Sequence, residues 1–191
     1  MAGKGSRFAD EGYVLPKPLL GVNDKPMIIQ AVDCLPSSDN NIFICLDEHI
    51  DKFRVDLTLK QTYSNCEVVS LDETTEGQAC TCKVGIDECG VDLDSPILIS
   101  ACDNGVYYDS EKYLKLLNDK SVDIIVWSFR NNQASKNNPN AYAWLDVDGD
   151  DSIKHVSCKN FIYDDPLTTH AIIGTMFFRK ARYFIDGLIQ N

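Results

Sequence analysis

The segment NIFICLDEHIDKFRVDLTLKQ (residues 41–61) decides the fold class, because a strand-length apolar run leads directly into a helix candidate. Asn41–Leu46 is apolar on successive residues, which is typical of a strand buried on both faces. Asp47–Gln61 is the helix candidate. The same alternation predicts further strands at Glu67–Ser70, Pro96–Ala101 and Val122–Phe129, and helices at Pro26–Leu35, Glu76–Glu88 and Ser110–Asp119. Strands that alternate with helices predict an α/β fold with a parallel sheet covered on both faces.

The last part of the chain has a different order of elements. Strand candidates follow one another without intervening helices, which indicates an antiparallel excursion, at Tyr142–Val147, Ile153–Ser157 and His170–Phe178. Asp148-Gly149 predicts a hairpin turn rather than a calcium loop, because the glycine and glutamate positions of a calcium loop are not met. Asn131–Asn140 is predicted to be a polar loop. We expect one α/β domain over residues 1–191 with a mixed, mostly parallel central sheet.

The composition is that of an ordinary soluble globular protein, with 44% apolar and 25% charged residues. The formal net charge of -11 argues against a nucleic acid or an anionic membrane as a partner, because these need a basic surface. A single anionic ligand stays compatible with a local cluster of Lys and Arg. No apolar run reaches the roughly 18–20 residues of a transmembrane helix, and the N-terminus has no signal-peptide pattern. We expect a cytoplasmic protein and leave open whether it forms a homo-oligomer.

The eight cysteines predict reduced structural thiols. Four of them lie in or beside apolar runs, where cysteine acts as a small hydrophobic residue: Cys34, Cys45, Cys66 and Cys102. No CxxC pair occurs in the sequence, and Cys80-Thr81-Cys82 is too tight for the usual zinc spacing.

A glycine-rich loop, AGKGSRF at Ala2–Phe8, is the first segment that points to a ligand. Small residues at Ala2, Gly3 and Gly5 let backbone N–H groups approach phosphate oxygens without obstruction by side chains. The order Gly-Lys-Ser/Thr that closes a Walker A loop is absent, and so is the third glycine of a dinucleotide-binding fingerprint. Composition alone leaves two interpretations open, a phosphate cradle or a glycine-rich terminal arm.

Three side chains in or near this loop favour the phosphate cradle. Ser6 adds a hydroxyl donor, and Arg7 adds a fixed charge that matches phosphate geometry. Lys17 lies between two prolines, which stiffen the backbone and restrict where its ammonium group can reach. Together these residues predict a binding site for a triphosphate.

The loop is the first of three linked segments, followed by LPKPLL at Leu15–Leu20 and DKPM at Asp24–Met27. In this order and spacing they resemble the signature of the sugar nucleotidyltransferases, in particular small bacterial members of capsule and surface-polysaccharide biosynthesis. The resemblance implies a Rossmann-like three-layer α/β sandwich, the GT-A-like nucleotidyltransferase fold. It also implies that a nucleoside triphosphate condenses with a sugar 1-phosphate, or a similar phosphorylated small molecule, and that pyrophosphate is released.

The resemblance implies a role for each charged or small residue of these segments. The loop backbone would bind the nucleotide phosphates through Ala2, Gly3, Gly5 and Ser6. Arg7 would hold the departing pyrophosphate, and Lys17 would contact the α-phosphate and stabilise the charge that develops there. Lys25 matches the second lysine of the signature, with anchoring of the following helix as the alternative.

Glu76–Ala79 resembles the segment in which this family reads the nucleobase. Gly77 would let the base lie close to the backbone, and Gln78 would offer both a donor and an acceptor to the base edge. A helix N-terminus explains the same residues, with Thr75 as the cap and Glu76 in the first turn. The two interpretations are compatible.

Asp103 directly follows the apolar run PILISAC and so stands at the carboxyl end of a predicted strand. Ligands bind at this end of open α/β sheets, and a carboxylate there can hold Mg²⁺, which bridges triphosphate oxygens. The family has its metal-binding aspartate at the end of this strand, so the resemblance implies Mg²⁺ as the cofactor. A turn residue is the alternative role for an aspartate at a strand end.

Three later segments resemble the walls of the family's sugar-phosphate pocket: Tyr142–Val147, Val156–Asn160 and Gly174–Phe178. The resemblance implies that Gly174 and Thr175 line the pocket floor and that Lys159 neutralises the acceptor phosphate. The family commonly has a glutamate where this chain has Cys158, so a contact with a sugar hydroxyl is lost. A solvated lysine on a strand is the alternative for Lys159.

Relatives of this kind extend further at both ends. They have an apolar strand before the glycine loop and a C-terminal part with a second metal-binding aspartate, for which this sequence offers no residue. We therefore expect either a fragment or an unusually short, inactive member.

Two rival functions remain at the level of sequence. One is a non-catalytic nucleotide- or sugar-phosphate-binding module of the same fold. The other is a metal-dependent glycosyltransferase with Cys102-Asp103-Asn104 as a degenerate Asp-x-Asp, against which the loop and the PKPL segment argue. The histidines share no spacing that indicates catalysis, so we expect structural or exposed positions for His49, His155 and His170.

Overall fold

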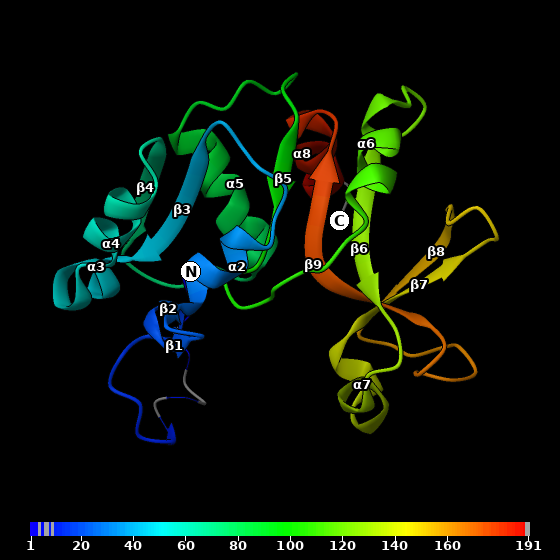
Figure 1. The fold of residues 1–191 in the computed structure, drawn as a ribbon, viewed down its shortest axis with the longest axis horizontal. Coiled ribbons are helices and arrows are strands. Elements are labelled where there is room, and N and C mark those ends of the chain that lie inside the picture. The colour runs from blue at the N-terminus through cyan, green and yellow to red at the C-terminus, as the bar shows by residue number, and fades with distance from the viewer. Residues whose placement is uncertain (4, 6–7, 9, 190–191) are drawn as a thin grey trace.

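The computed structural model describes residues 1–3, 5, 8 and 10–189. Two short strands, β1 (Gly21–Val22) and β2 (Lys25–Pro26), form an antiparallel pair. The longer strands form two groups that lie next to each other (Figure 1). The first is a parallel pair, β3 (Asn41–Leu46) and β4 (Cys66–Leu71). The second is an antiparallel sheet of β5 (Ile97–Ile99), β6 (Ile124–Phe129), β7 (Ala143–Val147), β8 (Ile153–Cys158) and β9 (His170–Phe178). The predicted α/β fold class is confirmed, and the predicted strands all exist.

The helices lie close to their predicted positions, with one exception. Their bounds are α2 (Met27–Asp33), α3 (Asp47–Phe53), α4 (Val55–Thr62), α5 (Gln78–Glu88) and α6 (Ser110–Asn118). The helix predicted over Asp47–Gln61 is two helices, because Arg54 has a left-handed backbone with a φ of 53°. The break allows α4 to bury Val55 and Leu59, whose exposed fractions are 1% and 0%. Burial of these side chains offsets the cost of the unfavourable backbone conformation.

The prediction of a mostly parallel sheet is wrong. Within the described residues β3 and β4 are the one parallel pair, whereas β5, β6 and β7 all pair with β9 in antiparallel orientation. β9 runs between β5 and β6 (Figure 1). A run of successive apolar residues predicts burial on both faces of a sheet, and a central antiparallel strand meets that condition as well as a parallel one does.

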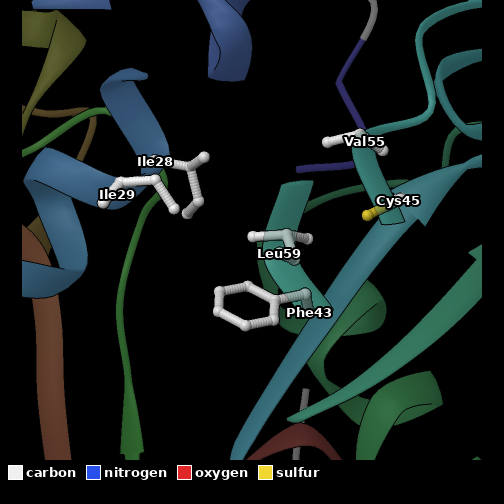
Figure 2. Close-up of a cluster of buried hydrophobic side chains, with 6 residues drawn as sticks. All are labelled: Ile28, Ile29, Phe43, Cys45, Val55 and Leu59. Atoms are coloured by element: carbon white, nitrogen blue, oxygen red, sulfur yellow. The ribbon is translucent and has the colours of Figure 1, made fainter. Parts of the chain in front are cut away.

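The two groups have separate hydrophobic cores. Figure 2 shows the core of the first group, in which α2, β3 and α4 contribute Ile28, Ile29, Phe43, Cys45, Val55 and Leu59. The core of the second group is formed by Val106, Trp127 and Phe177. Met1 and Cys102 pack against the first core, so the start of the chain lies beside the segment that follows β5.

The remaining connections are short. β7 and β8 form the hairpin predicted at Asp148-Gly149. Within the segment predicted as a loop, residues 133–137 form α7 (Gln133–Asn137), because the Asn132 side chain accepts a hydrogen bond from the N–H of Ala134 at 2.9 Å. The chain closes with α8 (Ala181–Ile189). In the described part of the chain, no helix has both the length and the apolar character to cross a membrane.

All eight cysteines are free thiols. Burial raises the pKa of Cys45 to about 12 and that of Cys82 to about 11. These two thiols therefore stay protonated at neutral pH and pack as small apolar groups.

Candidate active site

Lys17 and Asp103 form an ion pair, in which the lysine ammonium group donates to the aspartate carboxylate. Lys17 opens the short helix η1 (Lys17–Leu19), and Asp103 follows β5. Each side chain is 29% exposed, so the pair is accessible to solvent and to ligands. The fold thus brings together two residues that are 86 positions apart and that the sequence had assigned to the same site.

Gly5 and Phe8 of the glycine-rich segment lie against the same lysine. Gly5 has a left-handed φ of 60°, and a Cβ atom at this position would lie 3.5 Å from the Cβ of Lys17. The ammonium group of Lys17 is 5.4 Å from the centre of the Phe8 ring, which is within range of a cation–π contact. Ala2 is buried and Gly3 is exposed. The loop, the lysine and the aspartate therefore form one cluster.

The prolines that flank Lys17 hold its backbone in place. Pro16 is extended, Pro18 is buried, and the N–H of Leu20 donates to the carbonyl of Lys17 at 3.2 Å. Leu19 packs against the first core. The backbone of Lys17 is thus anchored on both sides, while its long side chain reaches into the site.

Two side chains that follow β5 bind β9 directly. The Ser100 hydroxyl lies 2.9 Å from that of Thr175, which is fully buried. Asn104 donates its amide N–H to the carbonyl of Ile173 at 2.8 Å. Asp103 lies between these two attachments, so the loop with the carboxylate is fastened to the strand that carries Gly174.

Asn104 is a site residue that the sequence had not singled out. In the sequence it is only the last position of a degenerate Asp-x-Asp. The signal that could have identified it is its place directly after a strand-end aspartate, where a polar side chain has to satisfy backbone groups that the strand no longer pairs.

Gln78 connects α5 to β9. Its amide donates to the carbonyl of Gly174 at 3.5 Å, and a Cβ atom on Gly174 would lie 3.7 Å from the Gln78 amide oxygen. Thr75 does not cap α5, because its hydroxyl donates to the carbonyl of Gly77 at 3.0 Å and lies 2.6 Å from the hydroxyl of Thr81. The predicted base-reading and sugar-phosphate residues are therefore neighbours, and the predicted cap is wrong.

Lys159 lies at the edge of this group. It follows β8 with a left-handed φ of 52°, its side chain is exposed, and its N–H donates to the carbonyl of Tyr142 at 3.0 Å. Ala143 pairs with Cys158, and Trp144 pairs with Ala171. These registers point Lys159 and the Gly174 region toward the same end of the sheet, although no direct contact joins Lys159 to Asp103.

Two predicted residues, Ser6 and Arg7, lie outside the described residues. The histidines occupy separate environments: His49 is buried, His155 contacts the Tyr163 hydroxyl at 3.1 Å, and His170 contacts the Ser128 hydroxyl at 2.8 Å. Burial lowers the pKa of His49 and of His170. A cavity of about 790 Å³ between the β7–β8 hairpin and residues 162–170 contains none of the predicted site residues.

Asp103 is the candidate for a metal ligand. Among the described residues, no three His, Cys, Asp or Glu side chains gather in a way that could hold a metal ion. Mg²⁺ does not require such a cluster, since it is commonly bound by one or two carboxylates together with substrate phosphates and water. The Asp103 carboxylate is the kind of oxygen ligand that Mg²⁺ takes, and it is partly exposed, but a cation would have to replace the Lys17 ammonium group as its partner.

The fold has counterparts among solved structures, although no protein-family model and no curated protein sequence matches the chain. A nucleoside-diphosphate-sugar pyrophosphorylase from Vibrio cholerae RC9 matches with a TM-score of 0.74 and 20% identity over 100% of this chain and 75% of that chain. A protein assigned as a glucose-1-phosphate thymidylyltransferase from Bacillus anthracis matches with a TM-score of 0.72 and 20% identity over 96% of this chain and 70% of that chain. The chain therefore has the fold of the sugar nucleotidyltransferases that its N-terminal segments resemble.

Proposed function

We propose that the chain is a Mg²⁺-dependent nucleotidyltransferase that joins a nucleoside triphosphate to a sugar 1-phosphate and releases pyrophosphate. The observation that carries the proposal is the meeting of Gly5, Lys17 and Asp103, which brings a glycine of the N-terminal loop, a cationic side chain and a carboxylate together. The fold supports it, since the two similar structures are named for enzymes of nucleotides and sugars.

In the proposed reaction, an oxygen of the acceptor phosphate forms a bond to the α-phosphorus of the nucleotide. The bond from the α-phosphorus to the bridging oxygen of the β-phosphate breaks, and pyrophosphate leaves with the electron pair. Enzymes catalyse such transfers mainly by positioning and by charge neutralisation. Lys17 would contact the α-phosphate, and Arg7 would hold the pyrophosphate. The loop backbone would bind the phosphates through Ala2, Gly3, Gly5 and Ser6.

Asp103 would hold Mg²⁺, which when bound supplies neutralisation of the triphosphate charge. In the structure, Asp103 is paired with Lys17. Both side chains would therefore change partners when the nucleotide and the cation bind, because the carboxylate turns to the cation and the ammonium group turns to a phosphate. The partial exposure of both groups permits this exchange.

The acceptor would bind on the β9 side of the site. Gly174 and Thr175 would line the floor of the sugar-phosphate pocket, and the exposed Lys159 would neutralise the acceptor phosphate. Gly77 and Gln78 would read the nucleobase from the start of α5. The contact between Gln78 and Gly174 supports a shared border between the two substrates.

A pyrophosphate-release assay with the four common nucleoside triphosphates and several sugar 1-phosphates tests the proposal. We expect release with one nucleotide–acceptor pair, dependent on Mg²⁺. A thermal-shift screen of the nucleotides with and without Mg²⁺ runs in parallel, since ligands that bind the native state raise the melting temperature. Nucleotide binding without pyrophosphate release would instead identify a binding module, and absence of both would refute the proposal.

A further inference from the structure

Three consecutive residues of β9 leave the strand ladder next to Asp103. β5 pairs with β9 as far as Ile99 and Met176, and the register of β6 jumps from Val126–Met176 to Ser128–Ile172. In the part of the chain that the structure describes, residues 173–175 therefore have no registered strand partner. Gly174, in the middle, has a left-handed φ of 95°. This segment, here called the β9 bulge (residues 173–175), is a break in the sheet at the predicted acceptor site.

Side chains from other segments form hydrogen bonds with the β9 bulge. Ser100 reaches the hydroxyl of Thr175, and Gln78 reaches the carbonyl of Gly174. Asn104 donates to the carbonyl of Ile173 at 2.8 Å, in a half-buried position. A carbonyl that is withdrawn from water costs free energy unless it accepts a hydrogen bond. The Asn104 amide supplies that hydrogen bond to the carbonyl of Ile173.

The same asparagine also fixes the loop on which Asp103 stands. The next residue, Gly105, packs so closely that a Cβ atom there would lie 3.4 Å from the Cys34 sulfur. Val106 is buried in the second core. On the other side, Asp103 is preceded by the Ser100–Thr175 contact. Two hydrogen bonds therefore tie the loop to the β9 bulge, Ser100–Thr175 before Asp103 and Asn104–Ile173 after it, and the Asn104 bond is the one directly next to Asp103 in the sequence.

We propose that Asn104 is a positioning residue that fixes the Asp103 carboxylate relative to the β9 bulge. The inference rests on the proposed function, in which Asp103 holds the cation and the bulge carries the acceptor. The Asn104–Ile173 hydrogen bond joins the loop that carries Asp103 to the β9 bulge. It would therefore hold the cation at a fixed distance from the acceptor. The role requires a short side chain with an N–H donor. Aspartate at this position would accept only and would face a carbonyl.

The test compares Asn104→Ala, Asn104→Asp and Asn104→Gln with the wild type. The matched control is Asn65→Ala, because Asn65 also donates its amide to a distant backbone carbonyl, that of Asp39, away from the site. Nucleotide binding is titrated against Mg²⁺, and amide hydrogen exchange is followed in the free protein. Loss of residues that orient metal ligands typically costs about 10–100-fold in metal affinity or activity.

We expect Asn104→Ala and Asn104→Asp to raise the Mg²⁺ concentration for half-maximal nucleotide binding about tenfold or more. Asn104→Gln, which keeps the amide donor, should recover part of the loss, and Asn65→Ala should leave the Mg²⁺ dependence unchanged. Hydrogen exchange should accelerate together in residues 100–106 and in the β9 bulge of Asn104→Ala. An Mg²⁺ dependence in Asn104→Ala equal to that of Asn65→Ala would overturn the inference.

The inference and the proposed function fail in different ways. If the wild type binds no nucleotide at any Mg²⁺ concentration, the proposed function is wrong. The attachment of the loop is then judged by hydrogen exchange alone. Unchanged exchange at both segments in Asn104→Ala would overturn the attachment, and coupled acceleration would support it.

Discussion

In the proposed reaction, Lys17 would supply the positive charge at the α-phosphate. We predict that Lys17→Ala lowers turnover a hundredfold or more, since loss of one donor to a transition state costs about 2.7–4 kcal/mol. The free energy of unfolding should change by less than about 1 kcal/mol, because ion pairs open to solvent contribute little. Pyrophosphate release at saturating substrate and urea unfolding measure the two effects.

A matched control for this variant lies on α5. Lys83 forms an ion pair with Asp87, and its side chain is 44% exposed, so Lys83→Ala removes a similar surface pair outside the site. It should keep the wild-type rate. A rate in Lys17→Ala that equals that of Lys83→Ala would remove Lys17 from the mechanism.

Asp103 carries the second residue-scale prediction. Asp103→Asn keeps the shape of the side chain and removes its charge, so nucleotide binding should lose its dependence on Mg²⁺ while the protein stays folded. Titration calorimetry with nucleotide, with and without Mg²⁺, measures this. Asp33→Asn is the control, because Asp33 pairs with Lys25 in a comparable exposed ion pair. Persistence of the Mg²⁺ effect in Asp103→Asn would show that the cation binds elsewhere.

The residues of the site differ in how far the sequence revealed them. The sequence alone predicted Lys17 and Asp103, because each stands in a local pattern. Lys17 lies between two prolines, and Asp103 follows an apolar strand. Asn104 was not, because its task is defined by the carbonyl of Ile173, 69 positions away. A side chain that satisfies a distant backbone group leaves no periodic signal in its own segment.

At the scale of secondary-structure elements, the role of Gln78 can be tested, because this residue lies at the contact between α5 and β9. If its amide reads the base edge, Gln78→Ala should reduce the preference for one nucleotide about ten- to a hundredfold, as loss of a buried hydrogen-bond partner costs about 1–3 kcal/mol. If it only joins α5 to Gly174, selectivity should stay unchanged and stability should fall slightly.

Competition binding with the four nucleotides on wild type and variant distinguishes the two roles. Gln133→Ala is a suitable control, because Gln133 lies on α7 and bonds Asn137 within the same helix. Equal selectivity in the wild type, Gln78→Ala and Gln133→Ala would leave Gln78 as a structural residue and move base reading to the backbone around Gly77.

Elements whose signal is local were well predicted. β3 and β9 have the predicted bounds, because unbroken apolar runs ended by polar residues define a strand. The break at Arg54 was missed, since the helical pattern continues through it. What ends α3 is the packing of Val55 and Leu59 against β3, and that contact exists only in the folded molecule.

At the scale of the whole molecule, the buried His49 and the half-buried His170 predict how the free energy of unfolding depends on pH. Burial lowers the pKa of His49 and His170 below the ordinary 6.5. The unfolded chain therefore takes up more protons as the pH falls through about 6.5, and the free energy of unfolding should decrease from pH 7 toward about pH 5. Aspartates with lowered pKa, such as Asp94 and Asp119, lose their stabilising effect only near and below 3.8.

Urea unfolding at several pH values measures this slope. The double variant His49→Gln/His170→Gln should show a flatter dependence between pH 7 and about pH 5, whatever its overall stability. A slope in the double variant as steep as in the wild type would assign the pH dependence to other groups.

The sequence by itself determined the α/β class and the positions of most elements, and it predicted a phosphate-binding role for the first segments. These properties depend on the order of apolar and small residues within short stretches, which the sequence displays directly. Only the tertiary structure decided that β9 enters between β5 and β6, that the sheet is largely antiparallel, and that Asn104 and Gln78 hold the β9 bulge. Strand pairing and distant hydrogen bonds depend on how all segments compete for burial and for backbone hydrogen-bond partners. The sequence of a single segment therefore does not predict them.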